Sequence, residues 1–171
     1  LSPERMADAR QPPRTEREVQ AMAKLEHWNT VEVYDFGHAA DGTFYYVMEY
    51  LEGLTLEELV WKAGPLPPPR AVHFLKQICG ALQEAHDHGL LHRDIKPANI
   101  ILSERAGFYD VAKLLDFGIV KHFEDSGESD LTMEGYIMGT RAYMSPEQAA
   151  AAGEVDVRSD IYSLGAVGYF L

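Results

Sequence analysis

Four polar residues in the middle of the chain have side chains that could carry out chemistry on phosphate. Asp94, Lys96 and Asn99 lie within one short segment, and Asp116 follows in the motif Leu115-Asp116-Phe117-Gly118. A carboxylate accepts a hydrogen bond from a hydroxyl group, and Asn and Asp oxygens are hard ligands that suit Mg²⁺ beside phosphate oxygens. A lysine adds a positive charge that can face a phosphate. The alternative is a plain loop, in which these side chains only satisfy a turn backbone.

The composition sets the kind of domain that must position these residues. A length of 171 residues predicts one compact domain. The only cysteine, Cys79, excludes an internal disulfide and a zinc-finger site, and favours a reducing, cytoplasmic setting. No apolar run is long enough to span a membrane, and the charged first residues exclude a signal peptide. A net charge of −12 repels nucleic acid and anionic lipid, so we expect neither as a partner.

Hydrophobic periodicity and turn residues predict the elements around the polar segment. We expect helices from about Thr15 to Leu25, at Leu56–Ala63, at Arg70–His88 and at Ser159–Leu171. Strands are expected at Val31–Phe36 and Thr43–Tyr50, joined as a hairpin, and at Ile100–Leu102 and Val111–Leu115. The helix at 70–88 has the clearest period, with one apolar face made of Val72, Leu75, Ile78, Cys79, Leu82 and Ala85. The polar segment therefore follows the longest helix and precedes two short strands.

Three motifs occur in a characteristic order along the chain. His92-Arg93-Asp94 is followed by Asn99, then by Asp116-Phe117-Gly118, then by the pair Pro146-Glu147. This order resembles the protein kinases, and three ordered motifs are far more specific than one. The Lys96-Pro97 pair and the stretch 139–149 are similar to bacterial Hanks-type serine/threonine kinases. The resemblance implies an α+β, protein kinase-like bilobal fold, with a partial small lobe (helix C and a β-hairpin) and the first part of the helical large lobe.

The resemblance also implies an activity and roles for the polar residues. The family transfers the γ-phosphate of ATP to serine and threonine hydroxyls of protein substrates, so ATP and Mg²⁺ are the expected cofactors. Asp94 would receive the hydrogen bond of the substrate hydroxyl, and Lys96 would face the γ-phosphate. Asn99 and Asp116 would hold the metal.

Matching to the family places further residues around the nucleotide. Glu18 takes the place of the helix glutamate that pairs with the ATP-anchoring lysine, although Glu16 is a nearby rival. Met48 resembles the gatekeeper. The backbone of Glu49 and Leu51 would bond adenine, and Ile101 would pack under its ring. The alternatives are a surface glutamate and an ordinary buried strand end.

The resemblance also predicts how residues 92–99, which we call the catalytic segment, are supported. A stack of buried residues would back it, formed by Met22, Val33, His92, Phe117 and Asp160. Asp160 would anchor the catalytic loop from the last helix. The alternative is that these are ordinary core residues together with a helix N-cap, an arrangement that would give the same sequence.

Residues between Gly118 and Gly139 match the activation segment of the family. Arg93 would pair with a phosphate in this segment, because an Arg–phosphate contact can order a loop. Thr132 is the predicted phosphorylation site, and Glu134 would substitute in part for a second phosphate. Thr140 would bridge the catalytic Asp and Lys. The alternative is that Thr132 and Glu134 are solvated residues in a polar loop.

The chain also departs from the family. No glycine-rich phosphate loop and no lysine precede Glu18; the first lysine is Lys24. We therefore expect residues 1–171 to be a kinase domain truncated at both ends, with 1–50 as a partial small lobe and hinge and 51–171 as a partial large lobe. Such a fragment is expected to be inactive alone.

Two rival functions remain open at this stage. A pseudokinase or scaffold keeps the fold without catalysis, and a small-molecule phosphotransferase uses similar Asp residues. Protein substrates are the partners that the resemblance favours, and a homodimer would allow autophosphorylation between two copies.

Overall fold

The computed structural model describes residues 14–115, 117, 141–150 and 155–171. Its elements are, in chain order, α2 (Arg14–Met22), β1 (Val33–His38), β2 (Phe44–Met48), β3 (Gly53–Thr55), α3 (Leu56–Ala63), α4 (Pro68–Asp87), the 3₁₀ turn η1 (Pro97–Asn99), β4 (Ile100–Arg105), β5 (Phe108–Leu114), α7 (Pro146–Ala149) and α8 (Val157–Phe170). Among these described residues, no helix is both long enough and apolar enough to cross a lipid bilayer.

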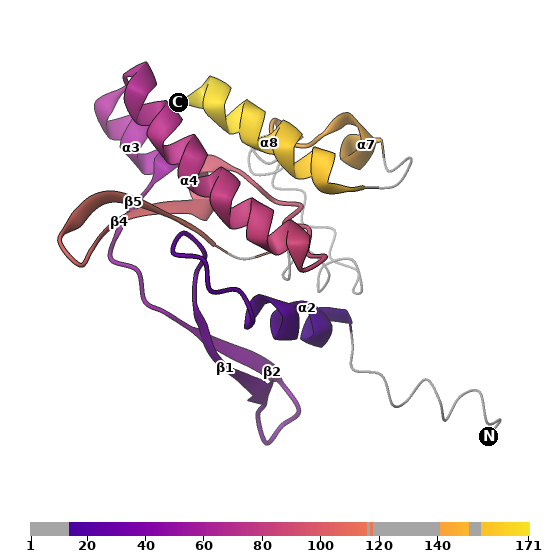
Figure 1. Ribbon diagram of the computed structural model, residues 1–171. Helices are drawn as coiled ribbons and strands as arrows, with labels where there is room; N and C mark the ends of the chain where they lie inside the picture. The colour runs from indigo at the N-terminus through magenta and orange to yellow at the C-terminus, as the bar shows by residue number, and fades with distance from the viewer. Residues whose placement is uncertain (1–13, 116, 118–140, 151–154) are drawn as a thin grey trace.

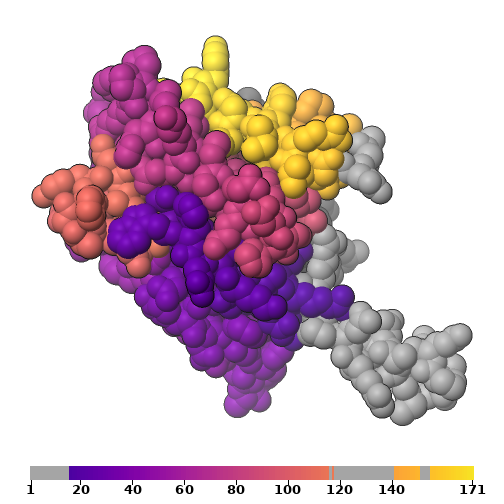
Figure 2. Space-filling model, in the orientation of Figure 1, coloured from indigo at the N-terminus to yellow at the C-terminus, as the bar shows by residue number. Residues whose placement is uncertain are grey.

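The elements form a small region and a larger helical region. In Figure 1, α2 lies beside the β1–β2 hairpin, while α3, α4 and α8 gather on the other side of the three strands β3–β5. Figure 2 shows the small region below and the helices α4 and α8 above. This two-part arrangement agrees with the bilobal α+β fold expected from the sequence.

Two antiparallel sheets position the polar segment. One is the β1–β2 hairpin, and the other has the strand order β3-β4-β5. The segment between α2 and β1 joins the second sheet, because Val31 N–H donates to the Leu114 carbonyl and Leu114 N–H donates to the Asn29 carbonyl. Strand β5 therefore connects the two regions directly.

Several element boundaries follow from local chemistry. Helix α3 begins with a capping box between Thr55 and Glu58 and ends at Gly64, which has φ +78°. Helix α4 begins with prolines and ends just before Gly89, which has φ +74°. Both helices lie where the sequence predicts them. Helix α2 is shorter than expected, since it ends at Met22 and not at Leu25.

The predicted apolar face of α4 is partly wrong. The buried residues of this helix are Phe74, Ile78, Ala81, Leu82 and Ala85. By contrast, Val72 is 47% exposed and Cys79 is exposed. The sequence of α4 contains two overlapping apolar stripes, and the helix packs against both β5 and α8. The buried stripe is therefore the one that faces these two neighbours, and the periodicity alone does not choose it.

Strands β4 and β5 are longer than predicted because they form a tight hairpin. Arg105 pairs with Phe108, so only Ala106 and Gly107 make the turn. Both have positive φ, +51° and +81°, as in a two-residue type I′ turn. Strand β3, which the sequence did not predict, requires Gly53. A Cβ at that position would lie 1.9 Å from the Leu102 carbonyl oxygen of β4.

Candidate active site

The structure brings together the three polar residues that the sequence places in the catalytic segment. The amide nitrogen Nδ2 of Asn99 donates to the Asp94 carbonyl oxygen (2.8 Å) and to Asp94 Oδ2 (3.0 Å). Lys96 Nζ lies 3.0 Å from the same Oδ2. The turn η1 makes this possible, because it folds Asn99 back over the segment. Asp94 is thus held by an amide and an ammonium group.

The donor set of this cluster suits a divalent cation and a hydroxyl group. Both amide hydrogens of Asn99 point to Asp94, which turns the oxygen Oδ1 to the opposite side of the amide, where it can serve as a hard ligand. The side chains of Asp94 and Lys96 are 15% and 21% exposed, so a substrate can reach them from solvent. Within the described ranges, no three His, Cys, Asp or Glu side chains form a metal-binding group.

A buried carboxylate from α8 anchors the segment from behind. Asp160 is 1% exposed, and its oxygens accept the backbone N–H groups of His92 (2.9 Å) and Arg93 (2.8 Å). Arg93 has φ +64°, a conformation that is unfavourable for a residue with a Cβ. Hydrogen bonds to a charged acceptor are among the stronger ones in proteins. Asp160 therefore holds a strained backbone in place, and the anchoring contact expected from the sequence is confirmed.

The His92 ring makes a second support. Its Nε2 lies 2.7 Å from the Leu115 carbonyl oxygen and must be the donor, because a carbonyl oxygen can only accept. Its Nδ1 accepts the Asp94 N–H (3.2 Å). The ring also packs against Phe117, with 4.9 Å between centroids. His92 and Phe117 are both buried. The catalytic segment is thus tied to the chain that leads into Asp116.

Two contacts connect Arg93 with more distant elements. Glu18 of α2 lies 3.6 Å from the Arg93 guanidinium group, so in this chain the carboxylate faces the catalytic segment. Gln148 of α7 donates to the Arg93 carbonyl oxygen (3.0 Å). Arg93 is therefore the point where the small region, the catalytic segment and α7 meet.

The expected adenine-binding segment lies between β2 and β3. Glu49 N–H donates to the Glu32 carbonyl oxygen (2.9 Å), so this N–H is already used. Leu51 and Ile101 are half-buried, and Leu51 packs on the hydrophobic core. Met48, the expected gatekeeper, is 39% exposed in this chain.

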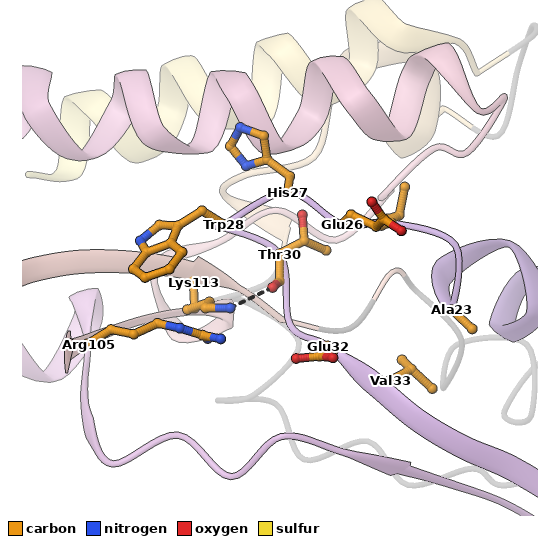
Figure 3. A pocket seen from close by; sticks show the side chains of 10 residues that line it. Ala23, Glu26, His27, Trp28, Thr30, Glu32, Val33, Arg105 and Lys113 are labelled. Atoms are coloured by element: carbon orange, nitrogen blue, oxygen red, sulfur yellow. Dashed lines mark hydrogen bonds between the residues drawn. The ribbon is translucent and has the colours of Figure 1, made fainter.

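The Glu49 side chain takes part in a group of charges that the sequence analysis missed. Its Oε1 accepts from Lys113 Nζ (2.5 Å), and its Oε2 accepts from Arg105 Nη1 (2.6 Å). Lys113 Nζ also donates to the Thr30 carbonyl oxygen (2.9 Å), as Figure 3 shows. We call Glu49, Arg105 and Lys113 the hinge charge cluster. The available signal was a lone lysine among the apolar residues at the end of β5.

Both partners of the buried pair have altered acidity. Burial lowers the pKa of the Lys113 ammonium group, while the hydrogen bond and charge of Glu49 oppose that shift. Burial alone would raise the pKa of Glu49. The hydrogen bonds from Lys113 and Glu32, together with the charges of Lys113 and Arg105, outweigh burial, so the pKa of Glu49 lies below its usual value. The carboxylate is therefore ionised at neutral pH.

Four of the residues predicted for the site lie outside the described residues: Asp116, Thr132, Glu134 and Thr140. Their roles as metal ligand, phosphorylation site, phosphate substitute and substrate-facing bridge stay predictions.

Comparison with known proteins identifies a family for this arrangement. The family model described as "Protein kinase domain" matches residues 2–171. The chain is 40% identical over 167 residues to the serine/threonine-protein kinase pkn3 of Myxococcus xanthus, covering 97% of this chain and 30% of that protein. It is 46% identical over 160 residues to the serine/threonine-protein kinase PknB of Mycolicibacterium smegmatis, covering 91% of this chain and 24% of that protein.

A solved structure shows the same fold. The kinase domain of PknI from Mycobacterium tuberculosis superposes with a TM-score of 0.69 at 33% sequence identity, covering 98% of this chain and 59% of that domain. The chain thus spans a quarter to a third of the length of these curated relatives, and about three fifths of a solved kinase domain.

Proposed function

This chain belongs to the protein kinase family, and on that basis we propose that the full-length protein is an ATP-dependent serine/threonine kinase that phosphorylates protein substrates. The observation that carries the proposal is the contact of Asp94 with both Lys96 and Asn99. A role limited to binding needs no such arrangement. The names of the relatives support serine and threonine as the acceptors.

In this proposal, the catalytic segment orients the acceptor hydroxyl and neutralises charge. Asp94 accepts the hydrogen bond of the substrate hydroxyl and aligns its oxygen with the γ-phosphate. Lys96, next to Asp94, places its ammonium group against the transferring phosphoryl group. Asn99 Oδ1 and Asp116 would hold Mg²⁺, which neutralises the phosphate charge when bound.

The adenine ring is assigned to the segment between β2 and β3. Because the Glu49 N–H is used by Glu32, the Glu49 carbonyl oxygen and the Leu51 N–H are the groups that we assign to adenine. Ile101, half-buried on β4, would contact the ring from the large-lobe side. We assign residues 1–50 to the small lobe and hinge, and 51–171 to the large lobe.

The proposal extends to regulation. Phosphate on Thr132 would pair with Arg93 in place of Glu18, which would free Glu18 for the ATP-anchoring lysine. Glu134 would supply part of that negative charge before phosphorylation, and Thr140 would bridge Asp94 and Lys96.

The test is phosphoryl transfer by the full-length protein. Incubation with radiolabelled ATP, Mg²⁺ and a generic protein substrate should label serine and threonine on acid hydrolysis, and the Asp94→Asn variant should leave the substrate unlabelled. Label on tyrosine alone, or equal labelling by both proteins, would contradict the proposal.

A further inference from the structure

The hinge charge cluster joins three separate parts of the chain behind the adenine-binding segment. Glu49 belongs to that segment, Arg105 and Lys113 belong to the β4–β5 hairpin, and Thr30 and Glu32 belong to the stretch before β1. Glu49 Oε1 accepts both Lys113 Nζ and the Glu32 N–H (3.0 Å). One carboxylate oxygen therefore receives donors from β5 and from the stretch before β1.

The lysine and the carboxylate of the cluster are almost fully buried. The side chains of Lys113 and Glu49 are 2% and 8% exposed. On the outer side, the Arg105 guanidinium group lies 4.8 Å from the centroid of the Trp28 ring, and both residues line a cavity of about 330 Å³. The Arg105 side chain is 33% exposed, so the Arg105–Glu49 bond lies at the edge of the cluster and the Lys113–Glu49 bond lies inside it.

Buried charges of this kind restrict the position of the backbone that carries them. Moving Glu49 away from Lys113 would leave a buried ammonium group without its counter-charge, which is strongly unfavourable. The Glu49 main chain is further fixed by its N–H bond to the Glu32 carbonyl. The Glu49 side chain is thus bonded to β5, and its backbone is bonded to the stretch before β1.

We propose that Lys113 and Arg105 are positioning residues that set base selectivity by fixing the Glu49 carbonyl oxygen. This inference rests on the proposed kinase function. Adenine presents an amino donor beside a ring acceptor, whereas guanine presents a carbonyl acceptor beside a ring N–H donor. A carbonyl and an N–H at fixed places match adenine and oppose guanine. Selectivity of this type needs buried polar groups that cannot move to suit the wrong base.

The test compares nucleotides in the full-length protein. Lys113→Met removes the buried ammonium group, Arg105→Met removes the outer bond, and Lys76→Met is the matched control at an exposed position of α4. We expect Lys113→Met to raise the KM for ATP about tenfold with kcat within about twofold, and to lower the ratio of kcat/KM for ATP to that for GTP. Arg105→Met should do the same more weakly, and Lys76→Met should change neither value.

The outcomes separate the inference from the function on which it rests. Absence of ATP-dependent transfer by the unsubstituted protein would overturn the kinase proposal. Transfer with an unchanged ATP:GTP ratio in a folded Lys113→Met protein would overturn the inference alone, as would a parallel loss of rate with both nucleotides. If Lys113→Met does not fold, the double variant Glu49→Gln/Lys113→Met decides, because it leaves no unpaired buried charge; retention of base selectivity there would also overturn the inference.

Discussion

The catalytic segment and the hinge charge cluster both contain a lysine paired with a carboxylate, but the two pairs lie in different surroundings. Lys96 and Asp94 are 21% and 15% exposed, whereas Lys113 and Glu49 are 2% and 8% exposed. The catalytic segment includes a strained residue, Arg93, and depends on a distant carboxylate to hold it. In the hinge charge cluster, one carboxylate bonds both cations directly.

This difference separates two uses of the same chemistry. A pair that water can reach contributes little to folding. Because water can reach it, a substrate can reach its side chains as well. A pair removed from water is poorly available to a substrate, and losing one partner destabilises the fold. We expect substitutions in the catalytic segment to change rates, and substitutions in the hinge charge cluster to change stability as well.

The largest expected effect is that of Asp94→Asn on the rate. Removing the charge should lower kcat about 10³-fold, the usual contribution of a group that takes the proton of the nucleophile. The KM for ATP should stay within about twofold, because Asp94 acts on the hydroxyl group and not on the nucleotide. Steady-state kinetics checks the rate, and urea denaturation should give a midpoint like that of the unsubstituted protein. A large loss of stability would contradict the expectation that the catalytic segment affects the rate and not the stability.

The second effect is the loss of stability in Lys113→Met. Leaving the Glu49 carboxylate buried beside Arg105 alone should lower the free energy of unfolding by about 3 kcal/mol. Urea denaturation followed by tryptophan fluorescence measures this loss. The double variant with Glu49→Gln should recover part of it, and Lys76→Met should cause no change. Equal stability of Lys113→Met and Lys76→Met would show that the buried pair does not restrict the hinge.

The third effect is on the metal requirement. Asn99→Ala removes one hard oxygen and two hydrogen bonds to Asp94, so the Mg²⁺ concentration for half-maximal activity should rise at least about tenfold. A titration of Mg²⁺ at saturating ATP measures this shift, and excess Mg²⁺ should restore part of the activity. An unchanged Mg²⁺ requirement would contradict the assignment of Asn99 as a ligand.

The smallest effect is on acid stability. The pKa of Glu49 is lower in the folded protein than its reference value of 4.5, so its stabilising contribution is complete above that pH and is lost as pH falls through the lower folded pKa. Glu49→Gln should therefore lose less stability than the unsubstituted protein between pH 5 and acid pH. Urea midpoints at several pH values compare the two proteins. If the urea midpoints of the two proteins change in parallel with pH, the partners of Glu49 do not stabilise its ionised carboxylate.

The features that the sequence predicts correctly are those that depend on local patterns. The capping residues and glycines around α3 and α4 place both helices to within a few residues. The close spacing of Asp94, Lys96 and Asn99 made their contact predictable, because one turn joins them. The resemblance supplied Asp160, since no local pattern connects it to a segment 68 residues earlier.

Features that depend on distant partners were missed. Glu49 and Lys113 are 64 residues apart and lie in elements with no shared period. The turn between β4 and β5 was also missed, because Ala106 is an unusual residue for a position with positive φ. In α4, Val72 and Phe74 are both apolar, and only the packing of β5 and α8 decides which of them is buried.

The anchoring of Arg93 by Asp160 also sets an order of events during synthesis. Asp160 is 67 residues further along the chain, and a ribosome adds about 5–20 residues per second. The strained loop therefore waits roughly 3 to 13 s for its anchor after it has been translated. Until α8 has been synthesised, the amide groups of His92 and Arg93 lack the Asp160 carboxylate that accepts their hydrogen bonds.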